Sequence, residues 1–361
     1  MNLAVDARWM VGQTRGMAHY ARALIEPVKQ EVNALLPKGY PATDYHNVYG
    51  NVGFFPYWEQ MELGKLCSKH QIKYLICPYN SAPLKLADTT KLILVVHDLI
   101  YLESLRHLPL SVSMYQNLGR FYRRMIVPKV ILNAHRLITV SHFTRQQICN
   151  TFKIPESEIT LIPNCITDDW RVSEPIPATE RLPYILTVSG EAPHKNLPML
   201  LRAFSAFKSL IPFDSSSPTL RIVGIKTQHQ LKFKTLARSL NIEQSILFEP
   251  FLDKSILQQR YQQARLCVFP SLIEGFGIPL LEAMASGTPV VCSNTCAFPE
   301  VIGNVGWLFN PYNLADMTNI LYVAWTDCYA QTNYALRGLE RVQFFSQTRC
   351  SELIDAFWTS L

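Results

Sequence analysis

The sequence predicts an α/β protein built from two doubly wound domains, each a parallel sheet with helices on both faces. At 361 residues the chain is longer than one ordinary domain. Short, continuously apolar runs alternate with helical stretches from end to end, as parallel strands covered on both faces require. A stretch with three prolines and little periodicity, residues 172–183, separates the two halves.

The elements follow in order along the chain. In the first half, strands are predicted at Leu3–Ala7, Tyr74–Cys77, Leu92–His97 and Leu137–Val140, and helices at about His19–Leu36, Met114–Asn133 and Thr144–Phe152. In the second half, strands are predicted at Tyr184–Ser189, Leu220–Gly224, Ile246–Phe248, Leu266–Phe269 and Pro289–Cys292, with helices beginning near Leu197, Thr227, Lys254, Ile278 and Asn313. This alternation indicates repeated βαβ units. We therefore predict domains at residues 1–172 and 173–344.

The amino-acid composition indicates a globular protein of a reducing compartment. With 48% hydrophobic and 17% charged residues, the chain is globular with ample material for a core. Nine scattered cysteines without a Cys-x-x-Cys pair are typical of a reducing compartment. The chain opens on a strand rather than a signal peptide, and no apolar run approaches the ~20 residues of a membrane span. We expect a cytoplasmic protein, and no Asp-x-Asp motif or His/Cys cluster indicates a metal.

The net charge of +6 lies entirely in the first half. Residues 1–172 hold 19 Lys and Arg against 13 Asp and Glu, whereas residues 173–361 hold 15 of each. This asymmetry indicates an anionic partner for the first half, with an ordinary solvated surface as the alternative. No nucleic-acid motif is present, which favours a membrane surface or a lipid-linked diphosphate. The basic and aromatic segment from Arg120 to Lys129 is the candidate for peripheral contact with an anionic membrane.

One segment carries most of the chemical information. Glu274 and Glu282 stand eight residues apart, the first in a loop after an apolar strand and the second inside a predicted helix. Such a loop and helix start present backbone N–H groups to an anion, here at Gly275, Phe276, Gly277 and Ile278. A carboxylate about one turn into the helix can accept both hydroxyls of a ribose. The segment therefore suits a nucleoside diphosphate sugar.

This pattern resembles the E-x7-E signature of the retaining glycosyltransferases of family 4 (glycosyltransferase group 1). Further matching segments occur in the family's order: Gly16–Tyr20, Ser141–Thr144, Ile162–Asn164, Ser189–Asn196 and Phe298–Gly303. The resemblance implies the GT-B fold, in which two Rossmann-like domains face each other across a cleft. The first would be the acceptor side and the second the nucleotide-sugar side, with a C-terminal helix in residues 345–361 crossing back to the first.

The resemblance also assigns site residues. His97, Lys195 and Glu274 would act catalytically, and Gly16, Ser189, His194 and Lys195 would contact the donor together with the Gly275–Ile278 loop and Glu282. The chain departs from the family where Ser189 replaces a glycine and where His194, Gly190 and Glu191 occupy places that often hold an arginine. Either His194, when protonated, or Arg15 would then supply the missing positive charge.

The implied activity is the transfer, with retention, of mannose or a similar hexose from a nucleotide-diphospho-sugar. GDP-mannose is the first expected donor, and a glycan or lipid-linked precursor of surface polysaccharide, such as O-antigen or exopolysaccharide, is the expected acceptor. No metal or other cofactor is implied. Two alternatives stay open. One is a non-catalytic GT-B protein that binds nucleotide or glycan, suggested by the lost arginine and glycine. The other is a sugar-nucleotide epimerase of the same architecture, which would lack the Glu274/Glu282 spacing.

Overall fold

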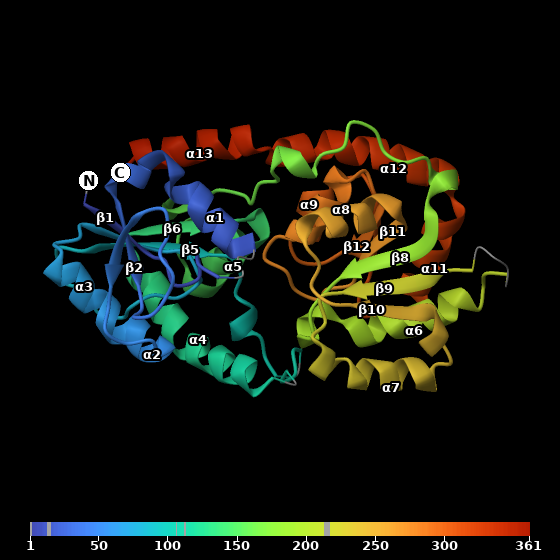
Figure 1. Cartoon of the computed structure of the whole chain (residues 1–361), viewed down its shortest axis with the longest axis horizontal. Coiled ribbons are helices and arrows are strands. Elements are labelled where there is room, and N and C mark those ends of the chain that lie inside the picture. The colour runs from blue at the N-terminus through green and yellow to red at the C-terminus, as the bar shows by residue number, and fades with distance from the viewer. Residues whose placement is uncertain (1, 13–15, 106, 112, 213–216) are drawn as a thin grey trace. The chain divides into compact units, whose positions relative to one another are not determined.

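The computed structural model describes residues 2–12, 16–105, 107–111, 113–212 and 217–361. The chain divides into two compact units (Figure 1). The first comprises Met1–Leu102, Tyr115–Cys165 and Thr348–Leu361, and the second comprises Glu103–Met114 and Ile166–Gln347. The main division thus falls earlier than the boundary predicted after residue 172. The grouping of Glu103–Met114 with the second unit had no signal in the sequence.

In the described part of the first unit, seven strands form one parallel sheet in the order β3-β2-β1-β4-β5-β6-β7. The strands are β1 (Leu3–Asp6), β2 (Val32–Leu36), β3 (His46–Tyr49), β4 (Tyr74–Cys77), β5 (Lys91–Val96), β6 (Arg136–Thr139) and β7 (Ile159–Leu161). The chain moves outward from β1 through β2 and β3, then returns to place β4 on the other side. The order therefore reverses between β1 and β4, the position at which ligand clefts form in doubly wound sheets.

The helices of this unit are α1 (Gly16–Ile25), α2 (Phe55–Tyr57), α3 (Leu63–Lys69), α4 (Met114–Asn133), α5 (His142–Phe152) and α13 (Gln347–Thr359). Helix α4 has the predicted bounds. The hydroxyl of Ser141 caps α5 by accepting from the backbone N–H of Thr144 at 3.0 Å. Trp358 in α13 donates from its indole Nε1 to the carbonyl of Leu24 at 2.7 Å, which fixes this helix against the end of α1.

The predicted helix over His19–Leu36 is wrong in its second half. Helix α1 ends at Ile25, a 3-10 turn follows over Glu26–Glu31, and Val32–Leu36 is the buried strand β2. Pro27 cannot continue an α-helix. A five-residue apolar run reads equally well as a buried strand or a buried helix turn, so periodicity alone could not decide it. Strand β3 was not predicted because its sequence His46–Tyr49 has no continuous apolar run and buries only Val48, and β7 was not predicted because it has only three residues.

The described part of the second unit has a six-stranded parallel sheet in the order β10-β9-β8-β11-β12-β13. Its strands are β8 (Leu182–Val188), β9 (Thr219–Val223), β10 (Ile246–Glu249), β11 (Ala264–Phe269), β12 (Val290–Ser293) and β13 (Trp307–Phe309). The strand order reverses between β8 and β11. Both sheets thus have doubly wound topology, which confirms the predicted fold class.

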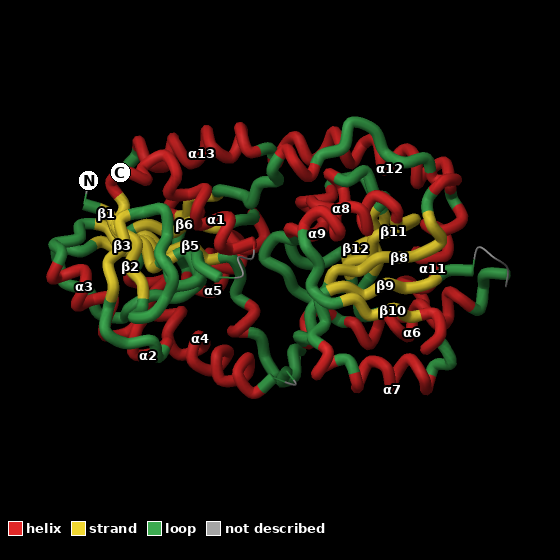
Figure 2. Tube along the Cα trace, viewed as in Figure 1, coloured by secondary structure: helices red, strands yellow, loops and turns green. Residues whose placement is uncertain are grey.

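Helices cover both faces of this second sheet (Figure 2). They are α6 (Leu197–Lys208), α7 (Leu231–Ser239), α8 (Lys254–Gln263), α9 (Ile278–Ala285), α10 (Phe298–Ile302), α11 (Leu314–Thr326) and α12 (Cys328–Arg341). The core between sheet and helices includes Phe204, Phe207 and Trp325, whose rings are in contact at centroid distances of 6.0 and 5.8 Å. The helix predicted to begin near Thr227 begins at Leu231, after a 3-10 turn.

Candidate functional site

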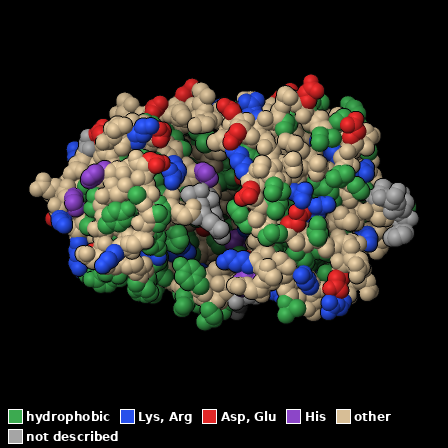
Figure 3. All heavy atoms as spheres, in the orientation of Figure 1, with side chains coloured by type: hydrophobic (Ala, Val, Ile, Leu, Met, Phe, Trp, Pro, Cys, Tyr) green, Lys and Arg blue, Asp and Glu red, His purple; other side chains and the backbone are tan. Residues whose placement is uncertain are grey.

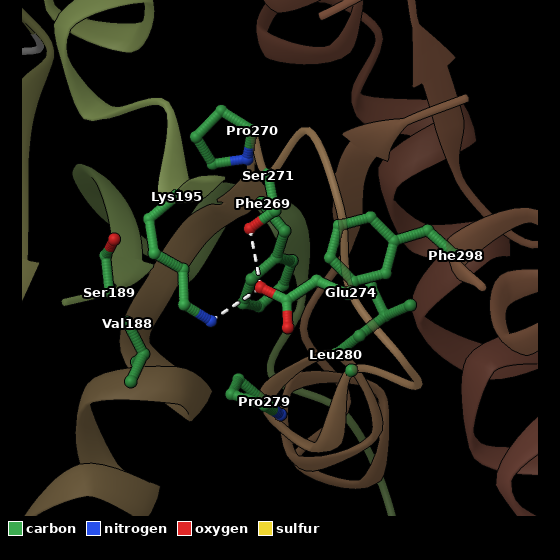
Figure 4. Close-up of a pocket in the computed structure, with 11 residues that line it drawn as sticks. Val188, Ser189, Lys195, Phe269, Pro270, Ser271, Glu274, Pro279, Leu280 and Phe298 are labelled. Atoms are coloured by element: carbon green, nitrogen blue, oxygen red, sulfur yellow. Dashed lines mark hydrogen bonds and ion pairs between the residues drawn. The ribbon is translucent and has the colours of Figure 1, made fainter. Parts of the chain in front are cut away.

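A pocket opens at the carboxyl edge of the second sheet, where β8 and β11 end and the chain leaves toward opposite faces. Figure 4 shows the side chains that line it. They come from the end of β8, the turn before α6, the end of β11, the loop into α9 and the start of α10: Val188, Ser189, Lys195, Phe269, Pro270, Ser271, Glu274, Gly277, Pro279, Leu280 and Phe298. The topology therefore places this pocket at the switch point of the sheet, where anionic ligands of such folds bind.

Lys195 and Glu274 form an ion pair at the centre of the pocket. The ammonium Nζ of Lys195 lies 2.5 Å from Oε1 of Glu274, and the hydroxyl of Ser271 donates to the same oxygen at 2.8 Å (Figure 4). Burial alone would raise the pKa of Glu274, but Lys195, His194 and the Ser271 hydroxyl outweigh it and lower that pKa. Glu274 is therefore a carboxylate at neutral pH, and Lys195 is its principal counter-charge.

The turn that carries Lys195 is fixed from both sides. It follows β8 as a 3-10 turn over Pro193–Lys195 and closes at Asn196, which adopts a left-handed conformation with φ of 54°. The amide of Asn196 donates to the carbonyl of Pro311 at 3.0 Å, and the N–H of Leu272 donates to the carbonyl of His194 at 2.7 Å. The turn and the Glu274 loop are thus joined through backbone, which holds the two charged side chains in register.

Gly277 is required at the start of α9. Its φ is +110°, and a Cβ there would lie 2.6 Å from Cε1 of Phe298. Both the backbone conformation and the contact exclude a larger residue. Gly277 and Pro279 bring the N-terminus of α9 to the pocket, where its first N–H groups and its dipole favour an anion. The ring of Phe276 packs in the core against Phe345 at 5.5 Å, so only its backbone is available to a ligand.

Glu282 does not line this pocket. It lies on α9, and its Oε2 accepts a hydrogen bond at 3.0 Å from the hydroxyl of Tyr261, a fully buried residue of α8. Burial raises the pKa of Glu282 to about 7, against the opposing effects of the Tyr261 hydrogen bond and the positive charge of Lys254. At neutral pH the carboxyl group is therefore present in both protonated and ionised forms, and ligands that favour one form will shift this balance.

The remaining predicted residues belong to the first unit. Gly16 begins α1, and His97 follows β5 directly. The imidazole Nε2 of His97 lies 2.9 Å from the carbonyl of Pro78, and its ring packs edge-on against Tyr20 at 5.2 Å. Burial lowers the pKa of His97 to about 4. The ring is therefore neutral near pH 7, with its proton on Nε2 directed at that carbonyl. Arg15 lies outside the described residues.

Three residues at or near the site were not predicted. Ser271 stands three residues before Glu274 in the same loop, so its hydroxyl was within reach by sequence alone. Tyr261 and Phe298 had no such signal, because only packing brings them to Glu282 and Gly277. The described residues contain no group of three or more His, Cys, Asp or Glu side chains placed to hold a metal ion.

Comparison with known proteins gives consistent matches over most of the chain. Residues 12–170 match the family model "Glycosyltransferase Family 4", and residues 168–321 match "Glycosyl transferases group 1". The chain is 30% identical over 236 residues to O-antigen chain mannosyltransferase B of Escherichia coli, covering 62% of this chain and 61% of that protein. It is 29% identical over 192 residues to O-antigen chain mannosyltransferase RfbU of Salmonella typhimurium, covering 53% and 51%.

The chain thus spans about half to three fifths of the length of these two relatives. Among solved structures, sucrose-phosphate synthase from Thermosynechococcus elongatus superposes with a TM-score of 0.77 over 99% of this chain and 98% of that one, at 17% identity. That likeness establishes the shared fold. With a family model matched in each unit, and with the Lys195–Glu274 pocket at the switch point of the second sheet, the chain belongs to the family 4 (group 1) glycosyltransferases of the GT-B fold.

Proposed function

We propose that the protein transfers a hexose, with mannose as the first candidate, from a nucleotide-diphospho-sugar to a lipid-linked or oligosaccharide acceptor, with retention at the anomeric carbon. The product would serve surface polysaccharide such as O-antigen or exopolysaccharide. The observation that carries this proposal is the Lys195–Glu274 ion pair at the carboxyl edge between β8 and β11, beside the N-terminus of α9. Both relatives are named as O-antigen chain mannosyltransferases, which supports mannose and O-antigen.

The chemistry follows from these groups. When the sugar leaves, negative charge grows on the nucleoside diphosphate, and the charge of Lys195 with the N–H groups of Gly277 and Ile278 would stabilise it. Glu274 is ionised and would accept hydrogen bonds from hydroxyls of the donor sugar. The imidazole of His97, in the first unit, is neutral near pH 7 and would add no charge to a ligand bound there. Glu282 would accept the ribose hydroxyls once its carboxyl group is ionised.

A donor panel tests this proposal against both alternatives. Purified protein is incubated with GDP-mannose and with UDP-sugars, with and without oligosaccharide acceptors, and released nucleoside diphosphate is measured. We expect acceptor-dependent release with one donor, and a product whose anomeric configuration by NMR matches that donor. Nucleotide-sugar binding without release would indicate a non-catalytic binding protein. Interconversion of the nucleotide sugar without any acceptor would indicate an epimerase.

Helix α4 offers a surface for contact with an anionic membrane. Large apolar side chains stand exposed along one side of it, at spacings of three, four or seven residues that keep them on one face: Met114 (71% exposed), Leu118 (63%), Phe121 (47%), Met125 (64%) and Leu132 (60%). Arg124 and Lys129 are exposed on the same helix. An exposed apolar stripe with flanking basic residues is typical of helices that lie in the membrane interface.

Neighbouring apolar residues extend this α4 stripe. Phe54 is 70% exposed and Met61 is 49% exposed, in the segment that Gln60 joins to α4 through a 2.9 Å hydrogen bond to the hydroxyl of Tyr122. Figure 3 shows hydrophobic side chains gathered at this lower margin of the first unit, over α2 and α4. Among the described helices, none combines the length and apolar character needed to span a bilayer. We therefore propose contact with the surface of the membrane.

Binding to vesicles should require anionic lipid and should weaken with salt, because exposed charges are screened beyond ~8 Å at physiological ionic strength. Co-sedimentation with neutral and anionic vesicles measures it. The double variant Arg124→Glu/Lys129→Glu should lose most of the binding, and Leu118→Ser/Met125→Ser should lose it without any change of charge. The matched control Lys69→Glu/Lys73→Glu reverses two exposed lysines outside α4 and should bind like the original protein. Equal recovery in the supernatant with both lipids would contradict the proposal.

A further inference from the structure

Arg8 lies just beyond the carboxyl end of β1 in an aromatic surround. Its guanidinium carbon is 4.9 Å from the ring centroid of Phe55, 5.3 Å from that of Trp9 and 5.6 Å from that of Tyr40. Its Nε and Nη1 are buried, and among the described residues neither has a hydrogen-bond partner. Buried guanidinium N–H groups are normally paired, since an unpaired one forfeits its hydration. The three rings offset part of that cost through cation–π attraction but accept no hydrogen bond.

The nearest carboxylate does not pair with this guanidinium. Asp6, at the end of β1, accepts the indole N–H of Trp58 at 3.1 Å and the backbone N–H of Arg8 at 3.3 Å. Burial raises the pKa of Asp6 to about 6, with Glu59 adding to the rise and the positive charge of Arg8 opposing it, so Asp6 is mostly ionised at neutral pH. Glu59 is occupied by hydrogen bonds from Ser81 and the hydroxyl of Tyr122. Within the described part of the chain, Asp6 therefore balances the charge of Arg8 without a direct ion pair to the guanidinium.

The position of this cluster in the fold is that of a ligand site. Strands β1 and β4 are neighbours, and the strand order of the first sheet reverses between them. Arg8 follows β1 and Tyr79 follows β4, so both stand at the switch point of this sheet. The hydroxyl of Tyr79 is also buried without a hydrogen-bond partner among the described residues. The ring of Trp9 lies between those of Tyr79 and Phe55, at centroid distances of 6.3 and 5.9 Å, and the Trp9 residue is 36% exposed.

We propose that Arg8, Trp9 and Phe55 form an acceptor subsite for a sugar that carries an anionic group, either a phosphate or a carboxylate. The indole and phenyl rings would pack against the apolar C–H face of the sugar, since flat aromatic surfaces complement it. The guanidinium would bind the oxyanion, for which its planar fork of donors is suited. The assignment of this ligand to the acceptor rests on the proposed function; the anion–sugar site itself rests on the geometry.

Binding of soluble probes tests the subsite without any transfer reaction. The 361-residue chain carries Lys195→Ala to weaken anion binding in the other pocket. Mannose 1-phosphate, glucuronate and methyl mannoside are then titrated by calorimetry and by the change in tryptophan fluorescence. At least one of the two anionic sugars should bind saturably and more tightly than the neutral methyl mannoside. Arg8→Gln should weaken that binding about tenfold, the typical effect of losing a charge-assisted hydrogen bond. Lys73→Gln is the control, because Lys73 also lies over one ring but at the amino end of β4.

The two anionic probes distinguish which kind of anionic group the acceptor carries. Preference for mannose 1-phosphate identifies a phosphate-bearing acceptor, and preference for glucuronate identifies an acidic sugar. Arg8→Lys keeps the charge and should retain part of the affinity. Trp9→Ala should weaken the binding of all three probes, and this variant tests the subsite if Arg8→Gln fails to fold. Failure of both anionic probes to saturate, or equal binding by Arg8→Gln and the parent chain, would overturn the subsite.

Failure of the subsite and failure of the proposed function give different results. If the donor panel shows no transfer but the anionic probe binds through Arg8, the anion–sugar site is supported and the proposed transfer reaction is contradicted. If transfer occurs, Arg8→Gln in the otherwise unaltered chain should raise the acceptor KM about tenfold and leave kcat at saturating acceptor nearly unchanged. Transfer with an unaltered acceptor KM in that variant would remove the subsite and leave the function in place.

Discussion

Replacing Lys195 with alanine is expected to lower kcat by about 10²–10³-fold, the usual effect of losing one preorganised contact to developing charge. The fold should survive, because Lys195 ends a surface turn held by backbone hydrogen bonds at His194 and Asn196. Steady-state release of nucleoside diphosphate measures the effect. Lys208→Ala is the matched control, a lysine at the far end of α6 that donates to Ser245. His194→Ala should cost less, since Lys195 carries a permanent positive charge and forms the ion pair with Glu274.

The ion pair makes this prediction sharper. Removing Lys195 takes away the main group that lowers the pKa of Glu274, so burial will raise that pKa in the variant. Glu274→Gln in the Lys195→Ala background should therefore cost less than Glu274→Gln alone, a coupling that a double-mutant cycle detects. Strict additivity would show that the two side chains act independently. Equal damage from His194→Ala would instead make the histidine the replacement for the arginine common in the family, with activity falling as pH rises.

Replacing Glu282 with glutamine is expected to weaken nucleoside diphosphate binding by about 10- to 100-fold while leaving the fold intact. Hydrogen bonds to a charged acceptor typically contribute about 1.5–3 kcal/mol, which corresponds to this range. Calorimetric titration with the nucleoside diphosphate measures it. Glu340→Gln, at an exposed position of α12, is the control. Unaltered affinity in Glu282→Gln would exclude the ribose as the partner of this carboxyl group.

The raised pKa of Glu282 predicts how binding depends on pH. Ribose hydroxyls donate to the ionised form, so affinity should rise with pH up to about 7 and then level off, and the Gln variant should lack this rise. Tyr261→Phe removes a hydrogen bond that lowers this pKa, so the rise should move to higher pH. Stability follows the opposite course. Glu282 holds its proton more tightly in the folded state than a carboxyl group with the ordinary pKa of 4.5 does. The stability that this proton contributes is therefore complete below pH 4.5 and is lost as the pH rises toward 7.

Calorimetry in buffers of different ionisation enthalpy gives an independent check. Near pH 7, binding of the nucleoside diphosphate should release protons from the original protein, because the bound ribose favours the carboxylate. The Glu282→Gln variant should release fewer. Proton uptake on binding would show instead that the protonated carboxyl group is the binding form, with its O–H donating to the ligand.

Much of this site could be predicted because it is local in the chain. The loop and helix from Glu274 to Glu282 follow β11 directly, so strand, loop and helix form one continuous unit. Its glycines and its helix start can be recognised in the sequence. Lys195 was predicted from a local segment too, because Ser189–Asn196 resembles the corresponding segment of the family. Its contact with Glu274 was not, because 79 residues separate the two. Packing of β8 beside β11 brings them together.

The different environments of Glu274 and Glu282 could be seen only in the structure. The eight-residue spacing suggests a pair that acts on one ligand, yet only Glu274 lines the pocket, and Glu282 is directed at Tyr261. The loop and the helix turn their side chains in different directions, and burial beside Tyr261 raises one pKa while Lys195 lowers the other. Neither environment follows from the identity of the residue.

The sequence by itself determined the fold class, the family and the segment that carries Glu274 and the start of α9, because alternation of apolar runs and the spacing of glycine, lysine and glutamate are properties of the chain read in order. Tertiary structure alone decided that Val32–Leu36 is a strand, that the apolar side of α4 is exposed, and that Nε and Nη1 of Arg8 lie near aromatic rings without a hydrogen-bond partner among the described residues. Each of these depends on which distant residues bury or expose a side chain, and burial is settled by the packing of the whole domain.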